Sequence, residues 1–392
     1  MQKLPVFSLL ALAMTAFLAL LTETFPAGML PQTSKDLRVS ESFAGQLVTA
    51  YAVGALVAAI PLTTATQGWR RRPLLLIALA GFLVFNLITA FSTDYSLTLV
   101  VRLLAGMAGG LVWGMLAGYS RRMVTERLQG KAMALAMLGA PIALSFGVPA
   151  GTFLGTLVGW RNTFIIMSVI ALALMVWVMA AVPDYSGQAA GRSSVGKVFL
   201  IPGVRSVLAV TTVWVLAHAT LYTYIEPFLQ TAGLAGRVDV ALFVFGIASV
   251  VGIWITGMLV DKILRRAVMA GLLIFLLAVV LMGIAGSRPF IAYLTIALWG
   301  LAFGGSGTML QTASADAAGD SADVAQSMLV TAWNLAIAGG GIAGGILLDT
   351  LGVKASTWVA GILLITGLLV TWCSARHGFR PGPRSALRKI PE

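Results

Sequence analysis

Four side chains that can carry charge lie inside long apolar stretches of this sequence. They are Glu23, Arg102, His218 and Glu226. In lipid such residues are rare, usually face the interior of a helix bundle, and mark the path of an ion or a substrate. Histidine titrates near neutral pH and carboxyl groups exchange protons, so these residue types indicate proton transfer coupled to the movement of a solute.

No motif of enzymatic chemistry accompanies these four residues. The chain has no phosphate loop of the G-x-x-x-x-G-K-[ST] type, only two histidines and a single cysteine, Cys373. ATP-driven transport by this chain, a disulfide framework and a Cys/His metal cluster are therefore not expected. We predict no enzymatic activity, no cofactor and no metal.

The composition indicates that the solvent of this chain is a bilayer. Of its 392 residues 59% are hydrophobic and only 10% are charged, and the mean hydropathy is +0.94. A soluble domain carries about 25% charged residues. The net charge of +12 could suggest nucleic acid as a partner. The basic residues lie in short segments between apolar stretches, however, so we expect lipid as the partner and no nucleic acid.

The apolar stretches predict twelve membrane-spanning helices. A span needs about 20 apolar residues, and a helix satisfies its own backbone hydrogen bonds in lipid. A β-barrel would need alternating strands of about ten residues, and none is seen. A signal peptide is the alternative for the first stretch, but that stretch runs to Leu30 without a small-residue cleavage site. The predicted cores are 5–30, 43–66, 73–92, 96–118, 131–154, 163–182, 203–230, 240–260, 267–286, 289–313, 325–348 and 355–375.

The distribution of lysine and arginine predicts the orientation. With the N-terminus inside, the inner segments hold 19 of these residues and the outer loops hold six. Because cytoplasmic loops carry the excess of positive charge, both termini are expected in the cytoplasm. We expect a multi-pass monomer in a bacterial inner membrane.

The chain repeats itself at a constant offset of 194 residues. This offset places Arg71 and Arg72 on Arg265 and Arg266, Gly106 and Gly110 on Gly300 and Gly304, and Gly147 and Gly151 on Gly341 and Gly345. Chance matches among 43 glycines are the alternative. Twofold repeats of spans are a transporter architecture, with the substrate near the midplane between the halves.

We therefore predict an all-α membrane protein of twelve transmembrane helices in two pseudo-twofold six-helix bundles. The bundles are residues 1–182 and 203–375. A polar, Gly/Ser-rich cytoplasmic linker, 183–202, joins them, and residues 376–392 form a cytoplasmic tail.

Several motifs resemble those of the major facilitator superfamily. "GMLVDKILRR", Gly257 to Arg266, resembles the G-x-L-x-D-x-x-x-R-R loop of that superfamily. In the superfamily the same motif also lies between spans two and three. In this chain the segment between spans two and three carries Gln67 in place of the acid. "RLLAGMAGG", from Arg102, resembles the fourth-span motif with its buried arginine. "GVPAGTFLG", from Gly147, resembles the fifth-span antiporter motif with altered order. "TETFPAGMLP" and "YTYIEPFL" resemble spans one and seven of twelve-span drug:proton antiporters, near the arabinose and purine-nucleoside efflux branch.

The resemblance implies a proton-coupled exporter of a small amphiphilic organic compound or drug, working by alternating access and conferring multidrug resistance. It also implies a helix bend and two gating contacts. The bend residues are Gly147, Pro149 and Gly151. The gating residues are Gly257, Asp261, Arg265 and Arg266 in one loop, and Arg122 opposite Asp316, Asp320 and Asp323. The alternative for these three acids is a local effect, because a helix N-terminus favours negative charge.

The buried charges form two predicted groups. Glu23 and Arg102 both lie roughly 10 Å below the outer surface, from the 1.5 Å rise per residue, and we expect them to pair, as a proton site or as a fixed ion pair. His218, Tyr222 and Glu226 follow at i, i+4 and i+8, which predicts one stripe on a helix. The alternatives are a packing role for His218 and contact with outer water for Glu226.

Aromatic and amide groups at plausible depth are candidates for the substrate cavity. Such walls suit amphiphilic ligands of moderate size, although Trp and Tyr near span ends also anchor proteins at the interface. The candidates are Tyr51, Trp113, Trp214, Tyr222, Trp299, Phe303 and Asn334. Three other functions remain open: a dedicated sugar or nucleoside efflux permease, uptake in place of efflux, and a membrane ligand sensor without transport. The absence of a long loop or extra domain disfavours the sensor.

Overall fold

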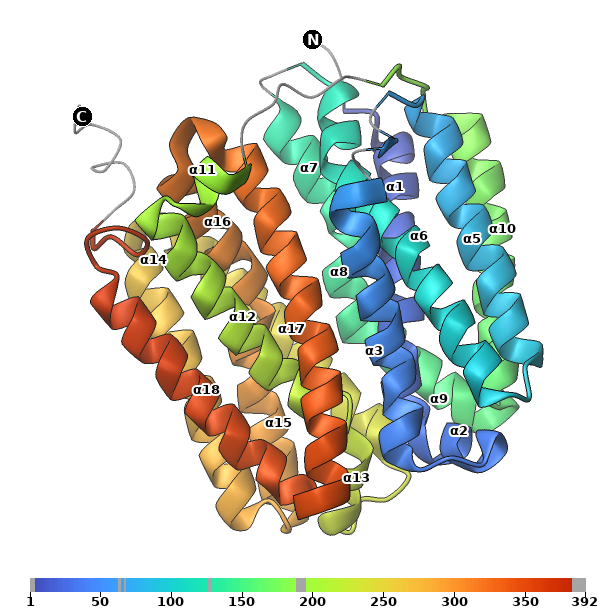
Figure 1. Cartoon of the computed structure of the whole chain (residues 1–392), viewed down its shortest axis with the longest axis vertical. Coiled ribbons are helices and arrows are strands. Elements are labelled where there is room, and N and C mark those ends of the chain that lie inside the picture. The colour runs from blue at the N-terminus through green and yellow to red at the C-terminus, as the bar shows by residue number, and fades with distance from the viewer. Residues whose placement is uncertain (1–3, 63–64, 67, 126–127, 188–194, 383–392) are drawn as a thin grey trace. The chain divides into compact units, whose positions relative to one another are not determined.

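A computed structural model describes residues 4–62, 65–66, 68–125, 128–187 and 195–382, apart from the side chains of residues 59, 60, 130, 195, 320 and 323. Every regular element in these ranges is helical. The chain separates into two compact units, residues 1–191 and 192–392, which are described one at a time (Figure 1).

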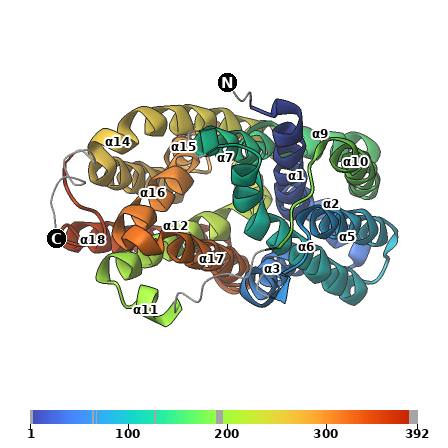
Figure 2. The same ribbon diagram turned by 90° about the horizontal axis from the view of Figure 1, so that it is seen from above.

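The first unit is built on five long helices and several shorter, irregular ones. Within it α3 packs on α6, α5 packs on α10 and α6, and α1 packs on α10 and on the segment α7 to α9 (Figure 2). Its elements are α1 (Val6–Thr24), the 3-10 helix η1 (Phe25–Met29), α2 (Leu30–Leu37), α3 (Glu41–Val57), the π-helix η2 (Ala58–Leu62), α5 (Arg71–Phe91), α6 (Tyr95–Arg122), α7 (Gln129–Met137), α8 (Gly139–Ile142), the π-helix η4 (Ala143–Gly147), α9 (Val148–Val158) and α10 (Trp160–Ala181).

The second unit repeats this plan with longer helices. Here α14 packs on α15, α12 packs on α17 and α18, and α14 also packs on α18. Its elements are α11 (Val195–Phe199), α12 (Pro202–Tyr222), α13 (Ile225–Thr231), α14 (Val238–Ala285), α15 (Pro289–Gly304), α16 (Ser306–Ala318), the 3-10 helix η5 (Gly319–Ser321), α17 (Ala322–Leu351) and α18 (Val353–Cys373).

The helices are consistent with twelve spans. Ten helical segments in the described ranges are long and apolar enough to cross a membrane. One of them, α14, has 48 residues and leaves helical geometry at Ile263 (φ −141°, ψ 40°), so it contains the eighth and ninth predicted spans. The second predicted span is α3, of 17 residues, continued by the five-residue η2.

Prolines explain where the helices of the first unit become irregular. A proline has no N–H to donate to the carbonyl four residues earlier, so a helix kinks or changes type there. Span one passes from α1 into η1 at Pro26, and η2 contains Pro61. In span five, η4 ends at Gly147, two residues before Pro149. The first of these breaks exposes backbone groups at the candidate site.

Glycines let the helices approach at matched positions in the two units. A Cβ added to Gly106 would lie 1.9 Å from the Tyr51 carbonyl oxygen, and one added to Gly300 would lie 2.3 Å from that of Phe245. Both residues of the second pair follow those of the first by 194 positions. Small residues allow this close packing in lipid, where little hydrophobic force drives helices together. The sequence repeat therefore corresponds to a repeat of helix contacts.

Candidate transport site

Arg102 lies on α6 and is completely buried in the first unit. Its Nη2 donates to the carbonyl oxygen of Thr22 at 2.7 Å and to that of Glu23 at 3.3 Å. Its Nε donates to the carbonyl oxygen of Leu47 on α3 at 3.3 Å. The guanidinium thus bridges spans one, two and four through main-chain oxygens.

The break in span one explains this arrangement. In a regular helix the Thr22 carbonyl would accept from the N–H of residue 26, but residue 26 is a proline. The carbonyl is therefore available to another donor, and Arg102 supplies one. Hydrogen bonds from a charged donor are stronger than neutral ones, so this contact compensates for part of the cost of burying the cation.

The predicted side-chain pair between Glu23 and Arg102 is wrong in this geometry. The structure shows no ion pair between them, and Arg102 contacts only the main chain of Glu23. The Glu23 side chain is 4% exposed, and its Oε1 has no hydrogen-bond partner, as is also true of Arg102 Nη1. The physical reason is the proline break, which offers the guanidinium carbonyl oxygens in place of the carboxylate.

Two aromatic rings complete the surroundings of the guanidinium. Its Cζ lies 5.0 Å from the ring centre of Tyr51 and 5.6 Å from that of Phe164. Such faces attract a cation electrostatically. The Tyr51 hydroxyl donates to the Ala19 carbonyl oxygen at 3.1 Å. Tyr51, a predicted cavity residue, is therefore part of the Arg102 surroundings.

Asn86 on α5 belongs to this group, and sequence reasoning missed it. Its side chain is fully buried, its Nδ2 donates to the Thr22 Oγ1 at 3.2 Å, and its Oδ1 has no partner. The available signal was an amide inside an apolar span, the same signal that made Asn334 a candidate.

An aromatic cluster forms the centre of the second unit. The His218 ring stacks on Phe303 with centroids 3.5 Å apart and planes within 5°. It also lies 5.0 Å from Tyr222 and 5.3 Å from Trp299. Phe245 contacts Trp299 at 4.9 Å. Three helices, α12, α14 and α15, contribute these rings, which we call the ring cluster: His218, Tyr222, Phe245, Trp299 and Phe303.

Glu226 does not continue the stripe of His218 and Tyr222, so the predicted single stripe is wrong. Helix α12 ends at Tyr222, Tyr224 leaves helical geometry (φ −114°, ψ 35°), and α13 begins at Ile225. Pro227 explains the break, because it cannot donate to the carbonyl four residues earlier. Glu226 Oε1 instead accepts from the Gly236 N–H at 3.4 Å.

The other cavity candidates lie apart from these two groups. Trp214 is buried on α12, its ring lies against Gly271, and its Nε1 has no partner. Asn334 on α17 donates from its Nδ2 to the Val330 carbonyl oxygen of its own helix at 2.9 Å. Trp113 is half-buried on α6.

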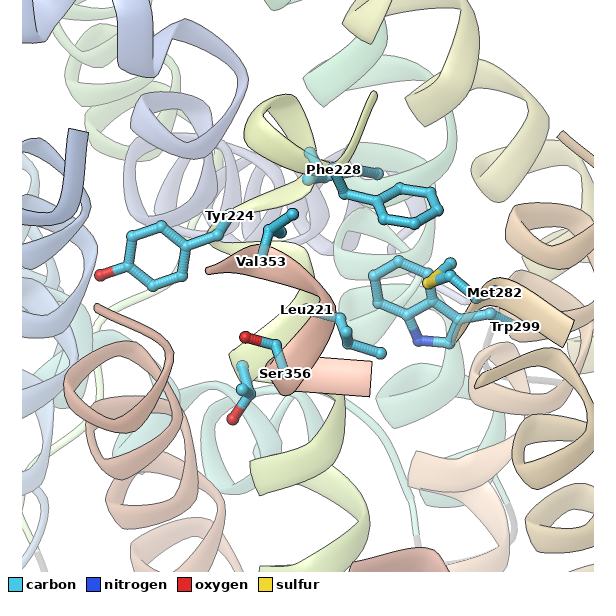
Figure 3. A pocket seen from close by; sticks show the side chains of 9 residues that line it. Leu221, Tyr224, Phe228, Met282, Trp299, Val353 and Ser356 are labelled. Atoms are coloured by element: carbon cyan, nitrogen blue, oxygen red, sulfur yellow. The ribbon is translucent and has the colours of Figure 1, made fainter. Parts of the chain in front are cut away.

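A small cavity adjoins the ring cluster (Figure 3). Its volume is about 10 Å³, which is room for about one water molecule. Trp299 and Tyr224 contribute to its wall, together with Ser356, whose buried Oγ has no partner. The described ranges contain no group of three His, Cys, Asp or Glu side chains that could hold a metal ion.

Two of the residues predicted to gate the cycle, Arg265 and Arg122, donate to main-chain oxygens of their own units. Arg265 donates to the carbonyl oxygens of Trp372 at 3.0 Å and Phe379 at 3.4 Å. Arg122 donates to the Ser186 carbonyl oxygen at 2.7 Å. The remaining gate residues with described side chains are Gly257, Asp261 and Arg266 on α14 and Asp316 on α16. Residue Gln67 and the side chains of Asp320 and Asp323 lie outside the described part of the structure.

The segment after α10 binds back onto the first unit. The Asp184 carboxylate pairs with Arg70 Nε at 2.5 Å and accepts from the Arg72 backbone N–H at 3.1 Å. The Arg71 N–H donates to the Tyr185 carbonyl oxygen at 2.9 Å. Burial raises the pKa of Asp184, but these bonds and the nearby arginine charges outweigh it and hold the pKa below its usual range.

Comparison with known proteins identifies the family. A sequence profile of the Major Facilitator Superfamily matches residues 12–341. The chain belongs to the major facilitator superfamily. As a member of it, the chain is a multi-pass membrane transporter of a small molecule and not an enzyme.

Its relatives in the superfamily include bacterial efflux proteins. The chain is 31% identical to the inner membrane transport protein YdhP of Escherichia coli O157:H7, over 94% of this chain and 96% of the relative. It is 29% identical to the purine ribonucleoside efflux pump NepI of Shigella dysenteriae, over 90% of each chain. It is 27% identical to a probable sugar efflux transporter of Helicobacter pylori, over 94% and 95%.

Solved structures of the superfamily share the fold. A bacterial homologue of the human lysosomal transporter Spinster matches with a TM-score of 0.73, 13% identity, and coverage of 96% of this chain and 98% of that one. The human organic anion transporter MFSD10 matches with a TM-score of 0.71, 16% identity, and coverage of 94% and 100%. At such identities the likeness concerns the fold alone.

Proposed function

We propose that this superfamily member is a proton-coupled secondary exporter of a small organic compound. In this proposal the protein works as a monomer in a bacterial inner membrane by alternating access, with both termini in the cytoplasm. Protons enter from outside and the substrate leaves. Its substrates are small amphiphilic compounds, drugs among them.

The observation that carries the proposal is the Glu23 carboxyl group. It is buried, its Oε1 has no partner, and the nearby Arg102 is bound to main-chain oxygens instead. A buried charge is normally paired, and an unpaired buried polar atom calls for an explanation. Since scaffolding uses the main chain around Glu23 but not its carboxylate, a role in proton exchange accounts for the residue.

Arg102 is proposed to be the fixed cation that responds to the protonation of Glu23. One of its nitrogens, Nη1, has no partner, while the other two hold it against spans one and two. In the proposed cycle the ionised Glu23 attracts this fixed cation, and protonation from the outside removes the attraction. Loss of the attraction between Glu23 and Arg102 favours closure toward the inward-facing state. Release of the proton inside restores the carboxylate.

Two further groups are proposed to support the cycle. Glu226 is proposed as a second proton carrier besides Glu23, because it is buried beside the break between α12 and α13. His218, on α12 in the ring cluster, is proposed as a further group that can carry protons. We further propose that Asp261 and the basic and acidic hairpin tips stabilise the outward-open state, as the resemblance implies.

Export of a single metabolite is the second candidate. It is favoured by the relatives, which include a purine ribonucleoside efflux pump and a probable sugar efflux transporter. On this alternative the protein exports a nucleoside or a sugar by the same proton cycle, and drugs are not substrates.

Proteoliposomes test the proposal and separate the two candidates. The protein is reconstituted with a pH-sensitive dye inside, and inosine, arabinose and ethidium are added in turn. Proton movement that depends on the added compound supports antiport, and the compound that elicits it identifies the class. If none of the three compounds elicits proton movement although the protein binds one of them, a sensor without transport would be favoured.

A further inference from the structure

We propose that the ring cluster of the second unit is a binding site for a flat heteroaromatic ring, and that His218 occupies this site when no ligand is bound. The proposal deepens the proposed function and rests on it, because it names the class of compound that is exported. It selects a base-bearing compound, such as a nucleoside, over a sugar.

Unpaired polar atoms distinguish the ring cluster from an ordinary apolar core. His218 Nδ1, the Tyr222 hydroxyl and Trp299 Nε1 all lack a hydrogen-bond partner, and each of the three residues is at least nine-tenths buried. Buried polar atoms in native proteins are nearly always bonded to protein or to ordered water. The Tyr222 hydroxyl and Trp299 Nε1, unpaired within one group of touching rings, are the arrangement expected of a site whose hydrogen-bond partners come with the ligand.

The geometry of the stack defines the shape of this ligand. His218 and Phe303 lie parallel with centroids 3.5 Å apart, so a flat ring lies directly against the face of Phe303. The space beside Phe303 therefore has the thickness of one flat ring. A purine or pyrimidine base fits such a space and stacks on any aromatic face. A saturated sugar ring is thicker and does not.

The polar atoms define the ligand's edge. An indole nitrogen is only a donor, and a phenol can donate as well as accept. Trp299 Nε1 and the Tyr222 hydroxyl therefore call for acceptors in the plane of the ligand, such as ring nitrogens or a ring carbonyl oxygen. A plain hydrocarbon ring would leave both donors unpaired, so the site selects a heteroaromatic ring.

The first unit shows that the fold does not require the rings of Trp299 and Phe303. The offset of 194 places Trp299 on Ala105 and Phe303 on Gly109. The same offset relates the close contact of Gly106 on α6 with α3 to the close contact of Gly300 on α15 with α14. The scaffold is therefore built in the first unit with small residues at these two positions. Their replacement by large aromatic residues in the second unit is explained by the ligand.

Binding at equilibrium, without a gradient, tests the site directly. The purified protein is placed in lipid nanodiscs, and binding of radiolabelled inosine is measured with hypoxanthine and ribose as competitors. We expect hypoxanthine to compete and ribose not to compete. Equal competition by ribose, or no binding of inosine and hypoxanthine, would overturn the proposal.

Variants locate the binding within the cluster. Trp299→Phe keeps a ring but loses the donor, so inosine should bind about tenfold more weakly, the effect of one buried hydrogen bond. The matched control is Trp254→Phe, because Trp254 on the same unit is 66% exposed. His218→Ala removes the ring that occupies the site and should tighten inosine binding. Equal affinities for Trp299→Phe and Trp254→Phe would contradict the assignment.

These outcomes are separate from the proton proposal. Glu23→Gln should retain the binding pattern, because Glu23 lies in the first unit and no gradient is applied. If inosine binds as expected but its transport is not coupled to protons, the proposed function fails and the ring site stands. If proton-coupled transport of another compound occurs without binding of bases, the ring site alone fails.

Discussion

Replacing Glu23 and Arg102 one at a time should affect stability very differently. Arg102→Met removes three hydrogen bonds to main-chain oxygens of spans one and two. The bond to Thr22 cannot be replaced by residue 26, which is a proline. A hydrogen bond to a charged group contributes about 1.5–3 kcal/mol, and relief from burying the cation offsets part of the total. We expect a net loss of about 3 kcal/mol.

Glu23→Gln should cost less than about 1 kcal/mol, because Oε1 has no partner to lose. Both values are read from the apparent melting temperature of the purified protein, followed by tryptophan fluorescence. Each kcal/mol corresponds to about 2–4 °C for a domain of roughly 200 residues. Arg102→Met should therefore melt about 6–12 °C lower, and Glu23→Gln less than about 4 °C lower. Equal decreases in melting temperature would indicate a fixed ion pair between the two side chains and refute this reasoning.

Two other predictions follow from contacts within the first unit. Gly106→Ala places a Cβ 1.9 Å from the Tyr51 carbonyl oxygen and should lower the yield of folded protein severalfold on size-exclusion chromatography. The control is Gly118→Ala on the same helix, whose Cβ would meet nothing within 4 Å and should not lower the yield. Equal yields would contradict the close packing. Because the pKa of Asp184 is lowered, its contacts with the arginines are present at neutral pH and are lost as the pH falls below the usual carboxyl range. Asp184→Asn should thus speed chymotrypsin cleavage after Tyr185 at neutral pH, and an unchanged rate would show that the carboxylate does not hold this segment.

Most of the fold could be predicted from the sequence, because lipid imposes simple rules. Each span must be apolar and helical, so hydropathy finds it, and the 194-residue repeat relates the contacts of Gly106 to those of Gly300. The merged helix α14 was not predictable, since the charged segment from Asp261 to Arg266 indicates a loop between two spans, whereas the helix continues through it and leaves helical geometry only at Ile263. The family was also predictable, because its motifs are local.

The details of the site were harder to predict. The partners of Arg102 are carbonyl oxygens, which every residue carries, so composition cannot indicate them. The available signal was Pro26, four residues after Thr22. Asn86 was missed although its amide inside an apolar span is the same signal that made Asn334 a candidate, and Glu226 was misplaced because a helical period was extended through a proline break. The errors on Arg102 and Glu226 concern the main chain, whose local geometry decides which side chains meet.

The most direct test of the proton-coupling claim is transport by Glu23→Gln. The protein is reconstituted with its outer face toward the lumen of vesicles that have an acidic interior. Radiolabelled inosine is added outside, and its accumulation driven by the pH gradient is compared with its counterflow exchange at equal pH. The glutamine keeps the shape of the protonated acid but cannot release a proton. We predict that this variant exchanges inosine by counterflow and does not accumulate it. Full accumulation driven by the pH gradient would contradict the role of Glu23 and point to Glu226 as the carrier.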